Sequence, residues 1–221
     1  MNAVANNWLE IIARMPAESA FIAHNIAWDE YEELLSEVGE ASGLRISYYR
    51  ETLQIMTLSP KHERYGRLFE KIMGILSLRL KMPILSFGSM TMRTRRDRAG
   101  KEPDACFYIQ SAPLIGNRDN LDFAVDPPPD IVLEIDIHHD SLAQFPLYVA
   151  LGVPEIWRYD GKRMRICLLS HGCYGEIAVS QALPILTAEH LTALLVSLRD
   201  DGEFATLTAF DEWLSYSSRK P

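Results

Sequence analysis

Alternating apolar and polar residues near the middle of the chain predict its central strand. In residues 129–137 the odd positions after Pro129 are apolar, and the even positions include Glu134 and Asp136. Successive strand side chains point to opposite faces, so these two carboxylates are expected side by side on one face. Apolar residues around Glu134 are typical of an interior strand, where a carboxylate stays ionised only beside cations or donors. A half-exposed strand with a solvated polar face is the alternative.

Periodicity along the rest of the chain predicts a mixed order of helices and strands. Apolar residues at helical spacing predict helices at residues 28–38 and 60–81, the second opened by the N-cap signature Ser59-Pro60. The other expected helices are residues 8–12, 140–151, 189–198 and 210–216, and the expected strands are residues 44–49, 52–57, 84–92, 103–109, 153–159, 163–169 and 174–179. Residues 93–101 are expected to form a basic turn and residues 111–129 a loop. This order predicts an α/β fold, a mixed β-sheet flanked by helices.

Length, charge and cysteine content narrow the class of protein. The 221 residues fit one domain, or one domain with additions. The net charge of -8 argues against a surface that binds nucleic acid everywhere, although it allows a local basic patch. The odd number of cysteines, the lack of a long apolar run and the lack of a signal-peptide pattern predict a cytoplasmic protein outside membranes.

Three acidic residues on two expected strands would meet if those strands are neighbours. They are Asp104, Glu134 and Asp136. Mg²⁺ (or Mn²⁺) is commonly held by one or two carboxylates together with water and phosphate oxygens. A bound ion lowers the pKa of its water and polarises a phosphate, which is what phosphodiester hydrolysis needs. The spacing alone is a weak pattern that unrelated sheets also match.

A basic cluster lies just before Asp104 in the sequence. It consists of Arg93, Arg95, Arg96, Arg98 and Lys101. Beside an acidic metal site, such cations could hold the backbone of DNA in an otherwise acidic protein. The alternative, which charge-rich turns usually favour, is a solvated hairpin tip.

Four segments resemble the Uma-type endonucleases, a branch of the restriction endonuclease-like PD-(D/E)xK superfamily. The segments are residues 59–62, 102–105, 129–135 and the block Leu147-Tyr148 to Gly152-Val153-Pro154-Glu155-Ile156-Trp157. The resemblance runs from about Trp28 to Val196. It implies a restriction endonuclease-like domain at residues 28–199, with an N-terminal extension at 1–27 and a helical tail at 200–221. It also implies Mg²⁺-dependent cleavage of DNA.

The same resemblance implies roles for individual residues. It places metal ligation on Asp104 and Glu134 and suggests that His62 orients phosphate or relays a proton. In a metal-dependent endonuclease, Asp136 could tune or share the ion. A helix-capping or solvent-facing histidine is the alternative for His62. The lysine that the superfamily uses to activate water falls here on Asp136 or on Gln144, and glutamine can orient water but carries no charge.

The sequence leaves open which group replaces the missing lysine and which function the protein has. Lys81, Lys101 or a second metal could replace its charge, and His138-His139 could be extra ligands or exposed turn residues.

Three functions are compatible with these patterns. The first is a metal-dependent DNA endonuclease, as a homodimer by analogy with enzymes that cut two strands. The second is a non-catalytic member of the fold that binds nucleic acid or protein. The third is a structural module that associates through the apolar strands at 153–179.

Overall fold

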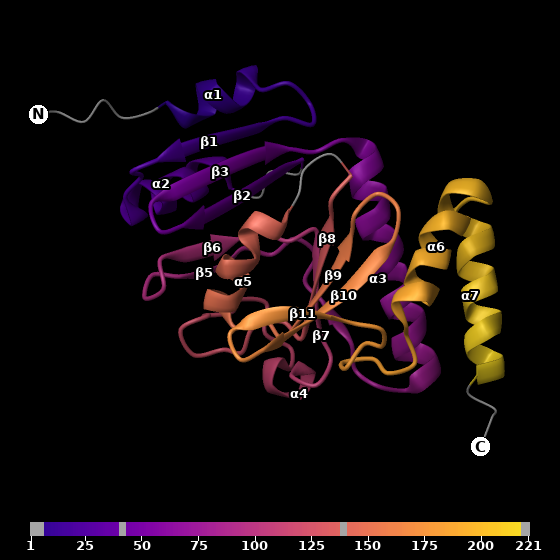
Figure 1. The fold of residues 1–221 in the computed structure, drawn as a ribbon. Helices are drawn as coiled ribbons and strands as arrows, with labels where there is room; N and C mark the ends of the chain where they lie inside the picture. The colour runs from indigo at the N-terminus through magenta and orange to yellow at the C-terminus, as the bar shows by residue number, and fades with distance from the viewer. Residues whose placement is uncertain (1–6, 40–42, 138–140, 218–221) are drawn as a thin grey trace, which may run out of the picture.

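A computed structural model describes residues 7–39, 43–137 and 141–217 and shows a mixed α/β fold with two sheets flanked by helices (Figure 1). The first sheet has the order β1-β3-β2-β6-β5 and is antiparallel throughout. Its strands are β1 (Ala20–His24), β2 (Leu44–Tyr49), β3 (Thr52–Thr57), β5 (Met92–Thr94) and β6 (Ala99–Lys101). The sequence predicted β2 and β3 with these bounds, whereas the edge strand β1 was not predicted.

The second sheet has the order β11-β10-β9-β8-β7-β4. Its strands are β4 (Leu85–Ser86), β7 (Ala105–Tyr108), β8 (Ile131–Ile135), β9 (Glu155–Tyr159), β10 (Met164–Ser170) and β11 (Cys173–Ile177). The pair β8–β9 is parallel and the other pairs are antiparallel, so the sheet is mixed as predicted. The predicted central strand is β8, and it lies inside the sheet between β7 and β9.

Helix α3 (Pro60–Leu80) covers one face of the second sheet. The Ser59 hydroxyl accepts a hydrogen bond from the backbone N–H of His62, and Pro60 occupies the first turn, as the N-cap signature predicted. Its buried stripe packs against Leu133 of β8 and Trp157 of β9. Helices α6 (Ala188–Asp200) and α7 (Glu203–Ser217) complete this layer (Figure 1).

The opposite face of the second sheet is covered by the 3-10 turn η1 (Ser141–Gln144) and helix α5 (Phe145–Leu151). The sequence predicted a helix over residues 140–151 in which Pro146 either forms a kink or starts a shifted turn. Pro146 lies in the first turn of α5, where its missing N–H is not needed. Tyr148 of α5 packs against Val132 and Ile156. Helix α5 also contacts β6, so it lies between the two sheets (Figure 1).

Helices α1 (Trp8–Arg14) and α2 (Trp28–Val38) pack on the first sheet, with Trp28 and Tyr31 against Tyr48.

The expected strand at residues 84–92 is wrong, because β4 and β5 are short and belong to different sheets. The expected loop at 111–129 contains one helical turn, α4 (Ala112–Ile115). In the described ranges, no helix is long and apolar enough to cross a membrane.

The apolar strands at residues 153–179 are used within the fold. Ile156, Trp157 and Ile166 are fully buried beneath α3, α5 and α6. These three side chains are therefore not available for an interface with another molecule, whereas the edge strand β11 is partly exposed.

Candidate active site

The chain passes from the first sheet to the second through Glu102-Pro103-Asp104, between β6 and β7. In the β7–β8 pair, Ala105 lies opposite Leu133, where the regular pairing ends. The backbone N–H of Asp104 donates to the carbonyl of the same Leu133 at 3.0 Å, so Asp104 enters β7 beside the part of β8 that carries Glu134. The isoleucines of β8 and Leu133 face α3, and Val132 faces α5, so the predicted division of the strand into two faces is confirmed.

A small cavity collects the acidic residues that the sequence singled out. Its lining comes from both sheets, α3 and η1: Arg45, Met56, His62, Lys101, Asp104, Glu134, Ile135, Asp136, Ser141 and Gln144. The cavity measures about 10 Å³, close to the lower limit for one water molecule. The structure thus brings Asp104, Glu134 and Asp136 together with His62 and Gln144.

Asp104 is held by donors from three directions. Its Oδ1 accepts from Nε of Arg45 at 3.1 Å, and its Oδ2 accepts from the backbone N–H of Ile135 at 2.7 Å. Nε2 of His62 lies 3.4 Å from the same Oδ2, which places the imidazole beside the carboxylate. Arg45 also donates to Glu63 of α3 at 3.0 Å.

Sequence reasoning missed Arg45, which lies on β2 and is only 7% exposed. Strand alternation puts Arg45 and Ser47 on the same face of β2, and this was the available signal. Local alternation does not show that this face meets the second sheet.

Glu134 shares one oxygen between two partners. Its Oε1 accepts a short hydrogen bond from the Tyr148 hydroxyl and lies 3.1 Å from Nζ of Lys101. Burial raises the pKa of Glu134, the ammonium of Lys101 partly offsets this, and the negative charge of Asp104 adds to it. Burial also raises the pKa of Tyr148 well above its usual value, which keeps the phenol protonated as a donor.

Lys101 does not belong to the basic surface where the sequence placed it. It is the last residue of β6 and is 3% exposed, with its ammonium turned to Glu134. A buried ion pair cannot contact the backbone of DNA from the surface of a hairpin. The predicted surface role of Lys101 is therefore wrong, whereas its proximity to Glu134 keeps it as a candidate for the missing charge.

The remaining basic residues lie at the exposed β5–β6 hairpin. Their charges are balanced by acidic neighbours: Arg93 pairs with Glu32 at 3.2 Å, Arg95 with Asp29 at 2.5 Å and Arg98 with Glu51 at 2.9 Å. Asp97 adds a further negative charge next to Arg96 in the sequence. These pairs weaken the attraction of the hairpin for phosphate.

Asp136 lies at the edge of the cavity, with its carboxylate bound to donors of its own. Its Oδ2 accepts from the backbone N–H of Ser141 at 2.9 Å, from the Ser141 hydroxyl at 2.8 Å and from the guanidinium of Arg158. Burial raises the pKa of Asp136, and the charge of Glu134 raises it further. Asp136 and Glu134 line the same cavity, as expected of two side chains on one face of the strand.

Two side chains in the cavity have buried polar atoms that lack a partner within the described chain, Nδ1 of His62 and Oε1 of Gln144. The amide nitrogen of Gln144 donates to Oε1 of Gln54 at 2.5 Å. An unpartnered buried acceptor is costly, which indicates that it serves a bound group. His138-His139, expected as ligands or turn residues, lie outside the described residues.

The oxygen atoms at the cavity can be compared with the ligands that a hard divalent cation such as Mg²⁺ requires. Two carboxylates on adjacent strands and the free Oε1 of Gln144 are oxygen ligands of the kind that Mg²⁺ accepts while keeping several waters. Across the described ranges, no three His, Cys, Asp or Glu side chains form a ready metal cage. The residues present fit a partly hydrated ion at Asp104 and Glu134 and do not fit a full protein cage.

Two other buried acids are structural. Asp130 accepts from the backbone N–H of Ile109 and Ser111 at 2.6 and 2.9 Å. Glu155 accepts from the indole N–H of Trp157 at 2.5 Å and from the Ser180 hydroxyl at 2.6 Å. Both carboxylates bind protein donors that fix loops, and neither lines the cavity that holds Asp104 and Glu134.

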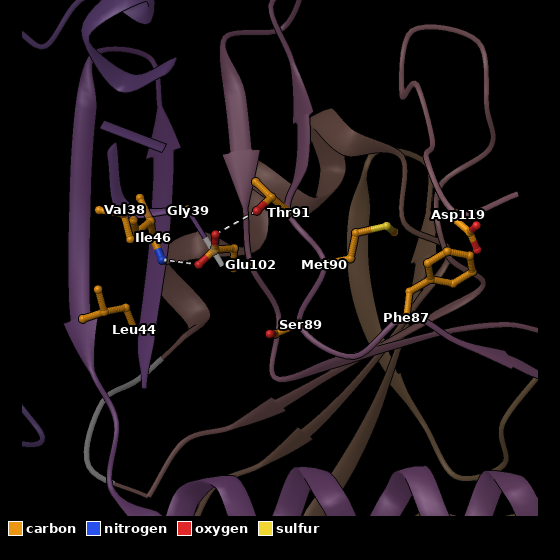
Figure 2. Close-up of a pocket in the computed structure, with 10 residues that line it drawn as sticks. All are labelled: Val38, Gly39, Leu44, Ile46, Phe87, Ser89, Met90, Thr91, Glu102 and Asp119. Atoms are coloured by element: carbon orange, nitrogen blue, oxygen red, sulfur yellow. Dashed lines mark hydrogen bonds between the residues drawn. The ribbon is translucent and has the colours of Figure 1, made fainter. Parts of the chain in front are cut away.

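A larger cavity of about 460 Å³ lies on the other side of the link, beside Glu102. Figure 2 shows the carboxylate of Glu102 between Ile46, whose N–H donates at 3.0 Å, and Thr91, whose hydroxyl donates at 2.8 Å. Burial raises the pKa of Glu102. Because both of its oxygens already bind protein donors, Glu102 fixes the link that carries Asp104.

Comparison with known proteins identifies a family and similar solved structures. Residues 28–199 match the family model described as "Uma2: Putative restriction endonuclease". A solved structure, described as a putative nuclease belonging to DUF820 from Anabaena variabilis, is 16% identical with a TM-score of 0.51, covering 76% of this chain and 98% of that chain. This likeness supports the fold. A search of curated proteins found no match.

Proposed function

Since this chain belongs to the Uma2 family of restriction endonuclease-like proteins, we propose that it is a nuclease that hydrolyses phosphodiester bonds of DNA with Mg²⁺ or Mn²⁺. The observation that carries the proposal is that Asp104, at the entry to β7, and Glu134, on the neighbouring strand β8, line one small cavity. Two carboxylates at one cavity can share an ion, whereas Asp130 and Glu155 do not line this cavity.

Asp104 and Glu134 would hold the ion, and Asp136, which lines the same cavity, would adjust the local charge. A bound divalent cation supplies a water of lowered pKa and polarises the phosphate. Oε1 of Gln144 is free to accept a proton of the attacking water and so orient it. His62 holds Asp104 through Nε2, and its free Nδ1 is placed to carry a proton or to bind phosphate.

DNA contacts would come from exposed cations near the cavity. Arg64 and Arg67 lie on the exposed side of α3, within two turns of His62. Arg93, Arg95, Arg96 and Arg98 of the hairpin would add contacts once their acidic partners are outcompeted by phosphate. A homodimer would place two such cavities on one duplex.

A second candidate function, a non-catalytic member of the fold, is favoured by one observation. Each carboxylate at the cavity is paired with a cation of the chain itself: Arg45 with Asp104, Lys101 with Glu134 and Arg158 with Asp136. Such a set is stable without a metal ion, so the cavity would then hold the two sheets together.

Plasmid nicking with Mg²⁺, Mn²⁺ or EDTA, together with a calorimetric Mn²⁺ titration, separates the two functions. We expect cation-dependent nicking that is lost in Asp104→Asn, while Asp119→Asn, a matched change at an exposed position, retains it. Circular dichroism and thermal unfolding show whether Asp104→Asn remains folded. A folded wild-type protein that binds no Mn²⁺ and leaves DNA intact would overturn the endonuclease proposal.

A further inference from the structure

Phosphodiester hydrolysis develops negative charge on the phosphoryl and leaving oxygens, so a fixed cation at the site lowers the barrier. Gln144 is neutral and its amide nitrogen is bound to Gln54. Lys81 caps the C-terminal end of α3, about 30 Å from His62 at the other end of that 21-residue helix. Among the described residues that line the cavity, Arg45 and Lys101 carry fixed cations. The guanidinium of Arg45 already donates to Asp104, to the carbonyl of Leu44 and to Glu63, whereas the ammonium of Lys101 faces Glu134.

The strand register explains how Lys101 reaches this place. Ser47 of β2 lies opposite Gln54 of β3 on one side and opposite Lys101 of β6 on the other. Gln54, Ser47 and Lys101 therefore form one row across the first sheet. Gln144 bonds to the Gln54 end of this row and Glu134 to the Lys101 end, so the row borders the cavity.

Packing on β6 fixes the position of Lys101. The preceding Gly100 lies so close to Tyr31 of α2 that a Cβ at position 100 would be 2.1 Å from the phenol oxygen. The strand cannot shift away from the cavity without losing this contact and its pairing with β2. Lys101 thus has a defined position, although its side chain is intrinsically flexible.

The ammonium of Lys101 has N–H donors that its bond to Glu134 does not use. Oε1 of Glu134 accepts from Tyr148 and from Lys101, and Nζ of Lys101 lies 5.9 Å from the centre of the Tyr148 ring. An ammonium has three N–H donors, of which the bond to Glu134 uses one. The others can point to water or to a phosphate oxygen in the cavity.

We propose that Lys101 is the catalytic ammonium of this site, which acts on the attacking water and on the phosphoryl oxygens of the bound phosphodiester. The inference rests on the proposed function and deepens it. Water oxygen forms the new bond to phosphorus while the bond from phosphorus to the leaving oxygen breaks. One proton passes from the attacking water to solvent, the leaving oxygen takes a proton from solvent, and Lys101 remains protonated throughout.

Two variants without a charge at position 101 test whether cleavage requires the ammonium of Lys101. Lys101→Met removes the ammonium, and Lys101→Gln removes the charge but keeps a donor for Glu134, so that the pair remains hydrogen-bonded. Both are expected to nick plasmid at least about 100-fold more slowly than the wild type. The matched control is Lys71→Met, which removes an exposed lysine paired with Glu203 at 2.5 Å and is expected to keep the wild-type rate.

Mn²⁺ affinity gives a readout that does not depend on activity. Because Lys101 competes with a cation for Glu134, both variants are expected to bind Mn²⁺ on the order of tenfold more tightly than the wild type. A merely structural lysine would leave this affinity unchanged or lower it. Slower cleavage with tighter cation binding is therefore the signature of the proposal.

A lysine moved from position 101 to position 144 tests whether an ammonium at the cavity is sufficient for cleavage. In the double variant Lys101→Gln with Gln144→Lys, the ammonium returns to the cavity from η1, and we expect nicking to recover at least about tenfold over Lys101→Gln. Cleavage by Lys101→Gln at the wild-type rate, unchanged Mn²⁺ affinity, or no recovery in the double variant would overturn this inference alone. Absence of cleavage by the wild-type protein would overturn the proposed function as well.

Discussion

The ammonium of Lys101 and the carboxylate of Glu134 form an ion pair that joins the two sheets, with 3.1 Å between Nζ and Oε1 and both side chains buried. Glu134→Gln leaves the lysine charge buried beside a neutral amide. We expect a loss of about 3 kcal/mol in the free energy of unfolding, measured by urea denaturation at neutral pH.

The control for this loss is Glu176→Gln, which breaks an exposed pair with Arg165 and is expected to cost less than about 1 kcal/mol. The double variant Lys101→Met with Glu134→Gln removes both charges and should recover most of the stability. If Glu134→Gln is as stable as Glu176→Gln, the pair does not hold the sheets together.

Two glycine substitutions should have opposite effects. Gly100→Ala places a Cβ 2.1 Å from the Tyr31 hydroxyl and is expected to cost about 2 kcal/mol of stability. Gly74→Ala, on α3, meets no atom within 4 Å and should stabilise the helix by about 0.5–1 kcal/mol. Differential scanning calorimetry measures both, and equal effects would contradict the tight packing of β6 on α2.

Glu102 predicts a pH effect on stability. Burial raises its pKa in the folded protein above the usual value of 4.5, so folding favours the protonated form. Its ionised form costs stability at neutral pH, and the wild type regains that stability as the pH falls through the raised pKa. Relative to wild type, Glu102→Gln should be most stable near pH 8 and lose this advantage towards about pH 4.5. A difference in melting temperature that does not vary with pH would contradict the assignment.

The two groups of arginines should differ in their contribution to DNA binding. Arg64 and Arg67 are exposed on α3, whereas Arg95 and Arg98 are engaged with Asp29 and Glu51. Replacing Arg64 and Arg67 by Ala should reduce the slope of log K against log salt by about 2.

The matched double variant of Arg95 and Arg98 should change that slope by less than about 1, because these charges are already partly neutralised. Fluorescence anisotropy with duplex DNA over a salt series gives both slopes. A larger change from the hairpin pair would identify the hairpin as the main phosphate contact.

Local periodicity was enough to predict much of the second sheet. The alternation in residues 129–137 placed Glu134 and Asp136 on one face, and the Ser59-Pro60 signature placed the start of α3 beside the cavity. These features depend on neighbours in sequence, whose side-chain directions follow from strand and helix geometry.

The cations of the cavity could not be predicted in the same way. Arg45 and Lys101 reach the acids from another sheet, and the contact depends on how the two sheets meet. Strand alternation shows that Arg45 shares a face with Ser47, but not what that face meets. For Lys101, the neighbouring arginines suggested a surface turn, and only the short strand β6 buries it.

The short link Glu102-Pro103-Asp104 also makes the cavity sensitive to chain length. Lys101 ends one sheet and Asp104 enters the other within a few residues, so both depend on the same stretch of backbone. One inserted residue would shift Asp104 relative to Lys101 and carry its carboxylate away from Arg45, His62 and the backbone N–H of Ile135. Members of this family that differ by a single insertion or deletion at this point would therefore differ in whether their acids and lysine can meet.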